Sequence, residues 1–337
     1  MLHLAVDTGT TNTTVWLVEN DRILRNVQRP VGVRNTSITG SHSLLYCTLR
    51  ESFLSLTREA PSPPRFVLAG GMITSSLGLV EVPHVLAPAG AEKLSRHVLM
   101  KTFPEVCPLP FFLVPGVRIQ RAPCQLSNAE RTDIIRGEET EIVGLLARRN
   151  SRKPWLFVHL GSHAKAIQID GQGRIVKSTT TLSGECLDVL RTQTILANRL
   201  ARLGSCKLNE RFFFQGARCA KRHGLLRALF MVRLLEENPR HRPADLYSFL
   251  VGALLLSDLH AFESQGLLES RTNQILLSGH PDLLAAWSLM LRKKKHEVEI
   301  VSPQKRFAAF LAGLRRIVFD SQLFRRFLAQ EGSRRSG

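Results

Sequence analysis

The chain has 337 residues, of which 44 % are hydrophobic and 22 % are charged, so it is long enough to bury one large core or two medium ones. It opens on an apolar stretch with no basic segment before it, and its longest apolar run, near Phe249–Leu256, is too short to cross a bilayer. The six cysteines form no C-x-x-C pair, which excludes the usual spacing of a zinc site. We therefore expect a cytoplasmic protein without a signal peptide, a membrane span or a disulfide framework.

The formal net charge of +18 raises the alternative of a nucleic-acid-binding protein. Most basic residues, however, are scattered as pairs along predicted helices, and aromatic residues make up only 7 % of the chain. The pairs are Arg148-Arg149, Lys221-Arg222, Arg315-Arg316, Arg325-Arg326 and Arg334-Arg335, and the one block is Arg292-Lys293-Lys294-Lys295. We therefore expect a basic solvated surface that favours anionic substrates, and we do not expect nucleic acid as a partner.

Strand and helix signals alternate in the first part of the chain. The predicted elements are strands at Leu2–Val6, Thr14–Glu19 and Ile23–Arg29, a helix at Ser41–Arg58, a break at Pro61–Pro64, and a strand at Phe66–Ala69 that ends in Gly70-Gly71. We expect few strands in the Pro-rich stretch that follows, up to about Gln120. A helix is expected at Thr140–Arg149.

The same order of elements returns in the second part. The predicted elements are strands at Trp155–His159, Ala164–Asp170 and Arg174–Thr180, mainly helices from Leu187 to about Phe262, a strand at Gln274–Leu277, a helix at Pro281–Arg292, a strand at Glu297–Val301 and a helix at Gln304–Val318. Each part begins with three strands joined by turns and then becomes helical. This repeat predicts a two-lobed α/β protein with a cleft between its lobes.

The first predicted strand delivers Asp7 into the turn Gly9-Thr10-Thr11-Asn12. Amides and hydroxyls in such a turn can face phosphoryl oxygens, and the carboxylate can hold Mg²⁺, usually through water. A second strand follows the turn, and a Gly-Lys-Ser/Thr ending is lacking, so the segment is not a P-loop. The alternative is an ordinary Asp-Gly hairpin turn.

A second turn, Gly161-Ser162-His163, follows the first strand of the second part. We expect it to face the Asp7 turn across the cleft, because two opposed phosphate-binding turns suit a phosphotransferase whose closing lobes exclude water. Plain turn chemistry at the glycine is the alternative.

Several short motifs occur in a fixed order along the chain. They are Asp7–Asn12, Ala69–Ser75 with Pro83, Val114–Gly116, Arg136–Glu141, Gly161–Lys165, Ser183–Glu185 and Ser278-Gly279. Together they resemble 2-dehydro-3-deoxygalactonokinases, a family of the sugar kinase, actin and heat-shock ATPase superfamily. The likeness extends to about Ile317. It departs from the pattern in the very basic section Lys207–His241 and at His159, where many superfamily members carry an aspartate.

The resemblance implies an actin-like ATPase fold of the ribonuclease H-like class, with duplicated mixed sheets and a central cleft. We expect an N-terminal lobe at 1–128 with the first phosphate turn, and a C-terminal lobe at 129–337 with the second turn and the adenosine-binding region. The implied activity is ATP-dependent phosphorylation of the terminal 6-hydroxyl of 2-dehydro-3-deoxy-D-galactonate in galactonate catabolism.

In this interpretation Asp7 is the Mg²⁺-linked carboxylate. The ATP phosphates are lined by Gly9, Thr10, Thr11, Asn12, Gly161 and Ser162. Arg136 binds the substrate carboxylate in a bidentate way, and either Glu138 or Glu139 accepts or orients the proton of the acceptor hydroxyl. The alternative for the two glutamates is stabilisation of a helix N-terminus through its dipole.

Four further residues complete the predicted site. His163 and Lys165, at alternate positions of a strand, are expected to contact phosphate or the sugar-acid carboxylate, although Lys165 as a surface lysine is the alternative. Glu185 is expected to contact sugar hydroxyls, against an N-cap role for the neighbouring Ser183. Gly279 permits close approach of adenine or its ribose, against simple strand–helix turn chemistry.

Two other classes of function stay open. One is a kinase of the same superfamily that acts on another sugar or sugar acid. The other is a non-catalytic protein, either a sugar-acid sensor or a nucleic-acid binder that uses its basic helices. The expected partners are a sugar acid and ATP, and assembly as a homodimer is left open.

Overall fold

The computed structural model describes residues 1–58, 60–121, 123–147, 153–201, 203–204, 206–268 and 274–335, with only the backbone described at 333–335. The chain divides into two compact units. The first contains Met1–Arg152, Asp170–Lys177 and Gln304–Gly337, and the second contains Lys153–Ile169 and Ser178–Pro303. This division differs from the expected boundary after residue 128, because the helix after Gly137 and the two C-terminal helices pack with the N-terminal sheet.

The first unit is built on a six-stranded sheet in the order β3-β2-β1-β4-β7-β6. Its strands are β1 (Leu2–Thr8), β2 (Thr13–Glu19), β3 (Arg22–Arg29), β4 (Val67–Gly71), β6 (Leu99–Phe103) and β7 (Cys107–Leu113). β1 pairs antiparallel with β2 and parallel with β4, and β4 pairs parallel with β7. The three-strand start that the sequence predicted is confirmed.

The expectation of few strands up to Gln120 is wrong. β6 and β7 form an antiparallel pair there, and three further short strands, β5 (Val85–Leu86), β8 (Val117–Arg118) and β9 (Ile134–Ile135), make a small sheet. The prolines misled the prediction because they lie at the start of β7, where that strand pairs only with β6. The buried run Phe111–Leu113 then joins the main sheet.

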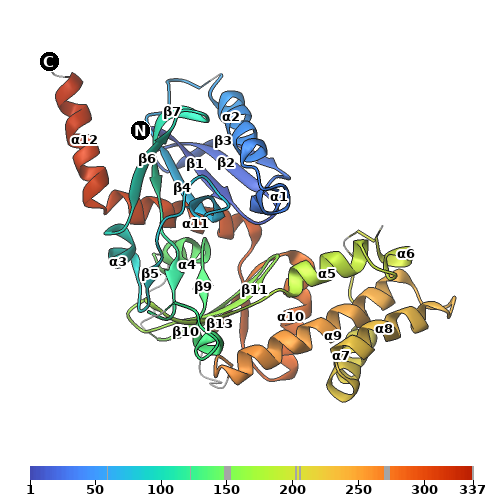
Figure 1. Ribbon diagram of the computed structural model, residues 1–337. Helices are drawn as coiled ribbons and strands as arrows, with labels where there is room; N and C mark the ends of the chain where they lie inside the picture. Colours follow the sequence, from blue (N-terminus) through green and yellow to red (C-terminus); the bar gives the residue numbers. More distant parts are fainter. Residues whose placement is uncertain are drawn as a thin grey trace. The chain divides into compact units, whose positions relative to one another are not determined.

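Helices cover both faces of this sheet (Figure 1). They are α1 (Val33–Thr39), α2 (Ser43–Thr57), α3 (Ala91–Ser95), α4 (Glu138–Leu146), α11 (Pro303–Phe319) and α12 (Gln322–Arg335), with 3₁₀ turns at Met72–Thr74 and Ala129–Arg131. On one face, Leu49 of α2 joins a core with Leu4 and Leu17. Trp16 points to the other face, because side chains alternate along a strand, and there its ring lies near Phe310 of α11.

α4 and α11 cross with their backbones in contact. A Cβ added to Gly144 would lie 1.7 Å from the carbonyl oxygen of Ala309, and one added to Gly313 would lie 1.9 Å from that of Thr140. Neither position can therefore carry a side chain without moving the helices apart. This crossing is the reason that α4 belongs to the first unit. The predicted helix Thr140–Arg149 begins two residues earlier than expected, and Arg148 and Arg149 lie outside the described residues.

The C-terminal tail, which the sequence resemblance did not cover, folds as α12 and packs on the first sheet. The buried ring of Phe324 lies 5.0 Å from those of Phe66 and Phe112 and 4.6 Å from that of Phe319, measured between ring centroids. Farther along α12, Glu331 pairs with Arg65 at 2.7 Å. The tail is thus part of the core of the first unit.

The second unit repeats the scheme with a five-stranded sheet in the order β12-β11-β10-β13-β14. Its strands are β10 (Trp155–Leu160), β11 (Ala164–Ile169), β12 (Ile175–Thr181), β13 (Gln274–Gly279) and β14 (Val298–Ile300). β10 pairs antiparallel with β11 and parallel with β13, just as β1 pairs with β2 and β4. The predicted duplication of a mixed sheet is confirmed.

The described residues of the second unit also contain six helices. They are α5 (Ser183–Thr192), α6 (Ala197–Leu200), α7 (Glu210–His223), α8 (Leu225–Glu236), α9 (Pro243–Ser264) and α10 (Pro281–Lys293). By length and composition α9 could cross a membrane, which the short apolar run in the sequence had not suggested. However, 78 % of its most apolar window is buried, as expected for a core helix.

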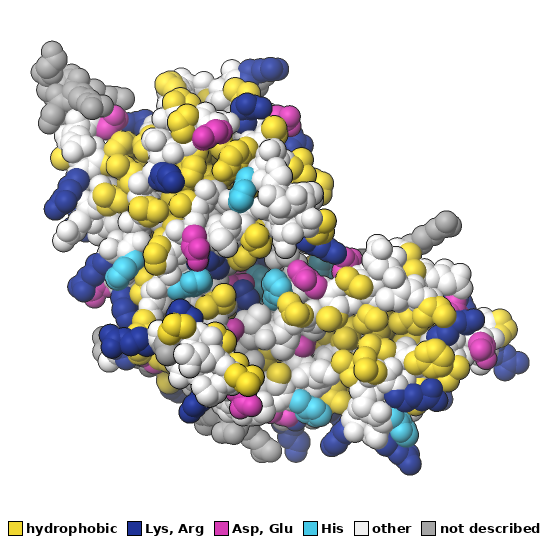
Figure 2. Space-filling view, viewed as in Figure 1, with side chains coloured by type: hydrophobic (Ala, Val, Ile, Leu, Met, Phe, Trp, Pro, Cys, Tyr) yellow, Lys and Arg dark blue, Asp and Glu magenta, His cyan; other side chains and the backbone are white. Residues whose placement is uncertain are grey.

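Lys and Arg side chains are dispersed among other side chains on the face seen in Figure 2. This fits the scattered basic pairs of the sequence. Of those pairs, Arg148-Arg149 lies outside the described residues, and the side chains of Arg334 and Arg335 are also outside them. Hydrophobic side chains gather on the same face over the helical part of the second unit.

We expect Phe324→Ala to lower the free energy of unfolding by about 3–5 kcal/mol, because it removes a buried ring from a closely packed aromatic cluster. Urea unfolding followed by circular dichroism measures this change. Phe230→Ala is the control, since Phe230 is 49 % exposed, and it should cost less than about 1 kcal/mol. Equal losses in the two variants would show that α12 does not stabilise the first unit.

Candidate functional site

The Asp7 turn is fixed by the segment that enters α1. The backbone N–H groups of Val33 and Arg34 donate to the carbonyl oxygens of Gly9 and Thr10 at 3.1 and 2.9 Å. A Cβ on Gly32 would lie 2.4 Å from the Thr10 oxygen, so only glycine allows the two segments to meet. The turn is therefore held from outside as well as by its own strands.

The hydroxyls around this turn point in two directions. Thr8 and Thr13 are buried, and the Thr13 hydroxyl donates to the carbonyl oxygen of Val31 at 2.8 Å. Thr11 and Asn12 are exposed, and the Asn12 side-chain amide donates to the Thr11 hydroxyl at 3.0 Å. The inner threonines thus stabilise the turn, whereas the outer polar groups are open to a ligand.

Asp7 lies beside the start of α4, although about 130 residues separate them in the chain. The parallel register of β1 and β4 sets Gly71 next to Thr8, and a Cβ on Gly71 would lie 2.8 Å from Asp7 Oδ1. A Cβ on Gly137 would in turn lie 3.2 Å from the Cα of Gly71. Both glycines have positive φ, 80° and 111°. The half-buried carboxylate of Asp7 and the segment that begins α4 therefore share one corner of the first unit.

Arg136 is buried, and its guanidinium binds protein groups. Nη1 donates to the carbonyl oxygen and, at 2.9 Å, the hydroxyl of Thr74, while Nη2 donates to the carbonyl oxygen of Val82 at 3.0 Å and to His84 Nδ1 at 3.3 Å. All four N–H groups of the terminal nitrogens therefore have partners. This arrangement contradicts the predicted bidentate contact with a substrate carboxylate. The terminal nitrogens of Arg136 that would make this contact already bind Thr74, Val82 and His84.

Glu138 and Glu139 are both buried at the N-terminus of α4. Glu138 accepts from the backbone N–H of Arg136 at 3.2 Å. Glu139 has no exposed surface, and it accepts from the N–H of Gly137 at 2.7 Å and from the Thr140 hydroxyl at 3.0 Å. Burial, reinforced by the neighbouring Glu138 carboxylate, raises the pKa of Glu139 to about 7. Both carboxylates thus accept hydrogen bonds from the backbone just before α4, and they differ in environment, while stabilisation of α4 through its dipole stays a prediction.

His84 belongs to this cluster and was not predicted from the sequence. Desolvation, followed by the nearby charge of Arg136, lowers its pKa to about 4, so the ring is neutral and Nδ1 can accept from the guanidinium. Its Nε2 is buried and has no hydrogen-bond partner in the part of the chain that the structure describes. Since 52 residues separate it from Arg136, no local pattern marked it.

In the second unit, three predicted segments meet at the end of β10. A Cβ on Gly279 would lie 2.1 Å from the carbonyl oxygen of Leu160, and one on Gly184 would lie 2.0 Å from that of Gly161. The backbone N–H of Glu185 donates to the Ser162 carbonyl at 2.8 Å. The predicted phosphate turn, the start of α5 and the start of α10 are thus brought together.

Two of the predicted substrate contacts lie beside this turn. His163 Nε2 is 3.7 Å from Glu185 Oε1. β11 begins only at Ala164, because a hydrogen bond from the Gly161 N–H to the His163 carbonyl closes the turn, so His163 is not on the strand as expected. Lys165 is 7 % exposed, which contradicts the alternative of a surface lysine.

The start of α5 also settles the role of its first residue. Leu182 occupies the N-cap position and Ser183 is the first helical residue, so Ser183 does not cap the helix. Its hydroxyl and that of Thr181 instead lie near the carboxylate of Asp258 of α9 and oppose the rise of its pKa.

Asp258 was not predicted from the sequence, because it lies within the apolar helix α9. It is 2 % exposed, and among the described residues its Oδ2 has no hydrogen-bond partner. Burial raises its pKa to about 6, against the opposing effect of the two hydroxyl donors. A buried carboxylate without a cation beside it is costly, so its place under the start of α5 marks it as a residue that positions this segment.

The predicted residues therefore form two groups. Asp7, Arg136 and the two glutamates meet in the first unit, whereas Gly161, Glu185 and Gly279 meet in the second. That the two turns face one another stays a prediction. Within the described residues, no group of three or more His, Cys, Asp or Glu side chains suited to hold a metal ion is present.

Known proteins resemble this chain over most of its length. The sequence model of the 2-keto-3-deoxy-galactonokinase family matches residues 7–317. The 2-dehydro-3-deoxygalactonokinase of Escherichia coli (strain K12) is 26 % identical over 194 residues, which is 58 % of this chain and 58 % of that protein. The chain thus spans less than two thirds of this curated relative.

Two solved structures share the fold. A Sinorhizobium meliloti protein described as a 2-dehydro-3-deoxygalactonokinase has a TM-score of 0.72 at 23 % identity, over 94 % of this chain and 99 % of that chain. The activator of the 2-hydroxyisocaproyl-CoA dehydratase from Clostridium difficile, solved with bound ADPNP, has a TM-score of 0.51 at 12 % identity, over 95 % and 96 %. The actin-like ATPase fold predicted from the sequence is confirmed, and at these identities the likeness shows the fold alone.

We expect the pKa of Glu139 to make stability depend on pH. Because the folded-state pKa of about 7 exceeds the ordinary value of 4.5, the folded protein holds the proton more tightly, and stability falls as the pH rises through this window. Glu139→Gln should remove this component, on the order of 2–3 kcal/mol between pH 4.5 and 8. Urea unfolding at several pH values measures it. The exposed Glu105→Gln is the control, and an unchanged pH slope in Glu139→Gln would contradict the assignment.

Proposed function

This chain belongs to the 2-keto-3-deoxy-galactonokinase family, and on that premise we propose that it transfers the γ-phosphoryl group of ATP to the 6-hydroxyl of 2-dehydro-3-deoxy-D-galactonate, as a cytoplasmic enzyme of galactonate catabolism. The observation that carries the proposal is the close approach, through Gly71, of Asp7 and the segment that begins α4 with its two carboxylates. A phosphate-facing turn and a candidate base at one corner are what phosphoryl transfer to a hydroxyl requires.

Asp7 and its turn are the proposed phosphate and metal side. A half-buried carboxylate among hydroxyls suits Mg²⁺, a hard cation that keeps several waters and takes few protein ligands. When bound, Mg²⁺ neutralises charge on the phosphate oxygens. The chain itself supplies the Asp7 carboxylate and the polar groups of Gly9, Thr10, Thr11 and Asn12, which the α1 segment holds in place.

Glu138 is the proposed general base, and Glu139 its support. Glu138 retains some exposure, 9 %, whereas Glu139 has none and has both carboxylate oxygens bonded to its own loop. A base must reach the proton that it accepts, so the more accessible carboxylate fits this role. Glu139 then fixes the backbone of Gly137, the residue before Glu138.

Arg136 is proposed as a positioning residue. Its bonds to Thr74 and Val82 hold the loop after β4 against the start of α4, and thereby hold Glu138 near Asp7. His163, Lys165 and Glu185 of the second unit are the proposed contacts of the sugar acid. Gly161 and Ser162 are proposed for phosphate, and Gly279 for the adenosine.

Two rival functions deserve tests. A kinase of the same superfamily with another sugar acceptor would keep the Asp7 corner and differ in substrate. A sensor or a nucleic-acid binder would lack turnover, and nucleic-acid binding would show as a mobility shift that weakens with salt. Whether the chain forms a homodimer is open to measurement by light scattering.

The proposed function is tested by ADP release, measured with a coupled assay on 2-dehydro-3-deoxygalactonate, its gluconate epimer and neutral hexoses. We expect the galactonate derivative to be the best substrate. Asp7→Asn should lower kcat by about 100-fold or more, because it removes the charge that holds the metal. Asp320→Asn, on the exposed end of α11, is the control. A neutral hexose as best substrate would overturn the sugar-acid assignment, and full activity of Asp7→Asn would overturn the metal role.

The two glutamates are separated by their pH profiles. Glu138→Gln should lower kcat by about 100-fold at every pH, because a general base contributes 10²–10⁴-fold. Glu139→Gln should retain more activity than Glu138→Gln and should mainly alter the pH dependence of kcat. If Glu139→Gln loses more activity than Glu138→Gln, with both variants folded by circular dichroism, the proposed roles are reversed.

A further inference from the structure

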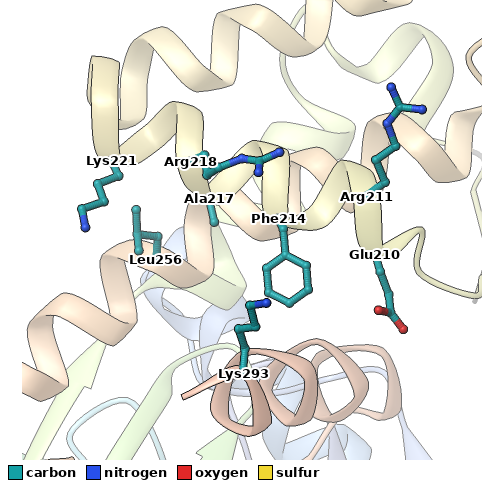
Figure 3. Close-up of a pocket in the computed structure, with 8 residues that line it drawn as sticks. All are labelled: Glu210, Arg211, Phe214, Ala217, Arg218, Lys221, Leu256 and Lys293. Atoms are coloured by element: carbon teal, nitrogen blue, oxygen red, sulfur yellow. The ribbon is translucent and has the colours of Figure 1, made fainter. Parts of the chain in front are cut away.

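The second unit contains a cavity that lies away from the segments described above. It is a cavity of about 440 Å³ between α7, α9 and α10 (Figure 3), lined by Glu210, Arg211, Phe214, Ala217, Arg218, Lys221, Leu256 and Lys293. On α9, Leu256 faces this cavity, whereas Asp258 contacts the start of α5. Two residues apart on a helix, these side chains point about 200° apart. The cavity therefore lies on the opposite side of α9 from the predicted phosphate turn.

Four cations surround this cavity without a carboxylate partner. Among the described residues, none of Arg211, Arg218 and Lys221 on α7 forms an ion pair, and neither does Lys293 on α10. Figure 3 shows Lys293 extending toward the ring of Phe214, and its Nζ lies 6.0 Å from the ring centroid. Glu210 is the one acidic residue of the lining.

Nearby helices pair their cations where a carboxylate is in reach. Lys294, the residue after Lys293, pairs with Glu263, and Arg242 pairs with Asp245. On α8, Arg233 pairs with Glu236. The lining of the cavity thus carries four cations and one carboxylate, and like charges on one helix repel unless an anion lies between them.

The side chains that line the cavity indicate which kind of ligand it can bind. Phe214, Ala217 and Leu256 form an apolar wall, which suits a flat apolar group better than a free phosphate. Arg211 and Arg218 are seven residues apart, so their Cα atoms are about 10 Å apart along α7, and an anion with several charged groups can contact this row of cations along its length. Arginine binds phosphate in a bidentate way. The volume lies within the range of small-molecule sites.

We propose that this cavity is a second, non-catalytic binding site for a nucleoside polyphosphate. The base lies against Phe214, and the phosphates lie between the cations of α7 and Lys293. A second copy of this chain is a poorer occupant, because a twofold contact would place the same cations against one another. A phosphorylated sugar acid carries two anionic groups but has no flat apolar part for the aromatic wall.

Binding of ADP to the full chain, measured by isothermal titration calorimetry, tests the proposal. We expect a second equivalent of ADP beyond that of the catalytic site. The double variant Arg218→Glu with Lys293→Glu should lose that equivalent, or weaken it about tenfold or more. The control Arg50→Glu with Arg58→Glu makes the same change of charge at exposed cations of α2 and its C-cap, and should keep the second equivalent. A single equivalent in the wild-type chain, or loss in the control as well, overturns the site.

Photolabelling with 8-azido-ADP locates the site independently of stoichiometry and of turnover. We expect labelled peptides from Glu210–His223 or from α10 of the wild-type chain, and no such label in the Arg218→Glu, Lys293→Glu variant. The milder pair Arg218→Gln with Lys293→Gln serves if the charge reversal perturbs folding. ADP release at saturating substrate should remain in all these variants. Label confined to other peptides would refute the proposal while leaving the proposed kinase activity untouched.

Discussion

The close approach of three chain segments at Gly71 is the constraint on which the first half of the site depends. Parallel pairing of β1 with β4 sets Gly71 next to Thr8, and both Gly71 and Gly137 adopt positive φ without a side chain. A Cβ at Gly71 would meet Asp7 Oδ1 at 2.8 Å, and one at Gly137 would meet Gly71. Any larger residue would push the start of α4, with its two glutamates, away from Asp7. Asp7, the candidate metal ligand, therefore lies close to the segment that begins α4 with the candidate base, because the backbones at Gly71 and Gly137 can touch.

The helices α11 and α12 support this corner by packing, and the corner contains two charged groups that are unfavourable to bury. The backbone contact of α4 with α11 at Gly144 and Gly313 fixes the helix, and α12 extends the same support through its aromatic cluster. Arg136 and Glu139 are both buried, which is tolerated only because nearly every polar atom described for them has a hydrogen-bond partner. Their pKa values respond accordingly: burial lowers that of Arg136 and raises that of Glu139.

In the second unit glycines again allow close contacts between backbones, but the buried charged groups differ from those of the first unit. Glycines at 184 and 279 bring the starts of α5 and α10 against the end of β10, as Gly71 does for β1. Here the buried carboxylate, Asp258, has hydroxyl partners and no described ion pair. Four cations of α7 and α10 that form no ion pair with described residues line the cavity on the other side of α9.

The sequence by itself determined the duplicated sheet, the two turns and the family, because short apolar strands, glycine turns and ordered motifs are local signals. It also placed Asp7, Glu138 and Gly279 at the ends of the right elements. It missed β6 and also β7, whose prolines hid a short buried run, and it assigned the guanidinium of Arg136 to a substrate. Only the tertiary structure decided that Arg136 binds Thr74, 62 residues away, that His84 and Asp258 belong to the two groups, and that the C-terminal helix completes the core. Such partners are chosen by burial and by the need to satisfy polar groups across the fold, which no local pattern records.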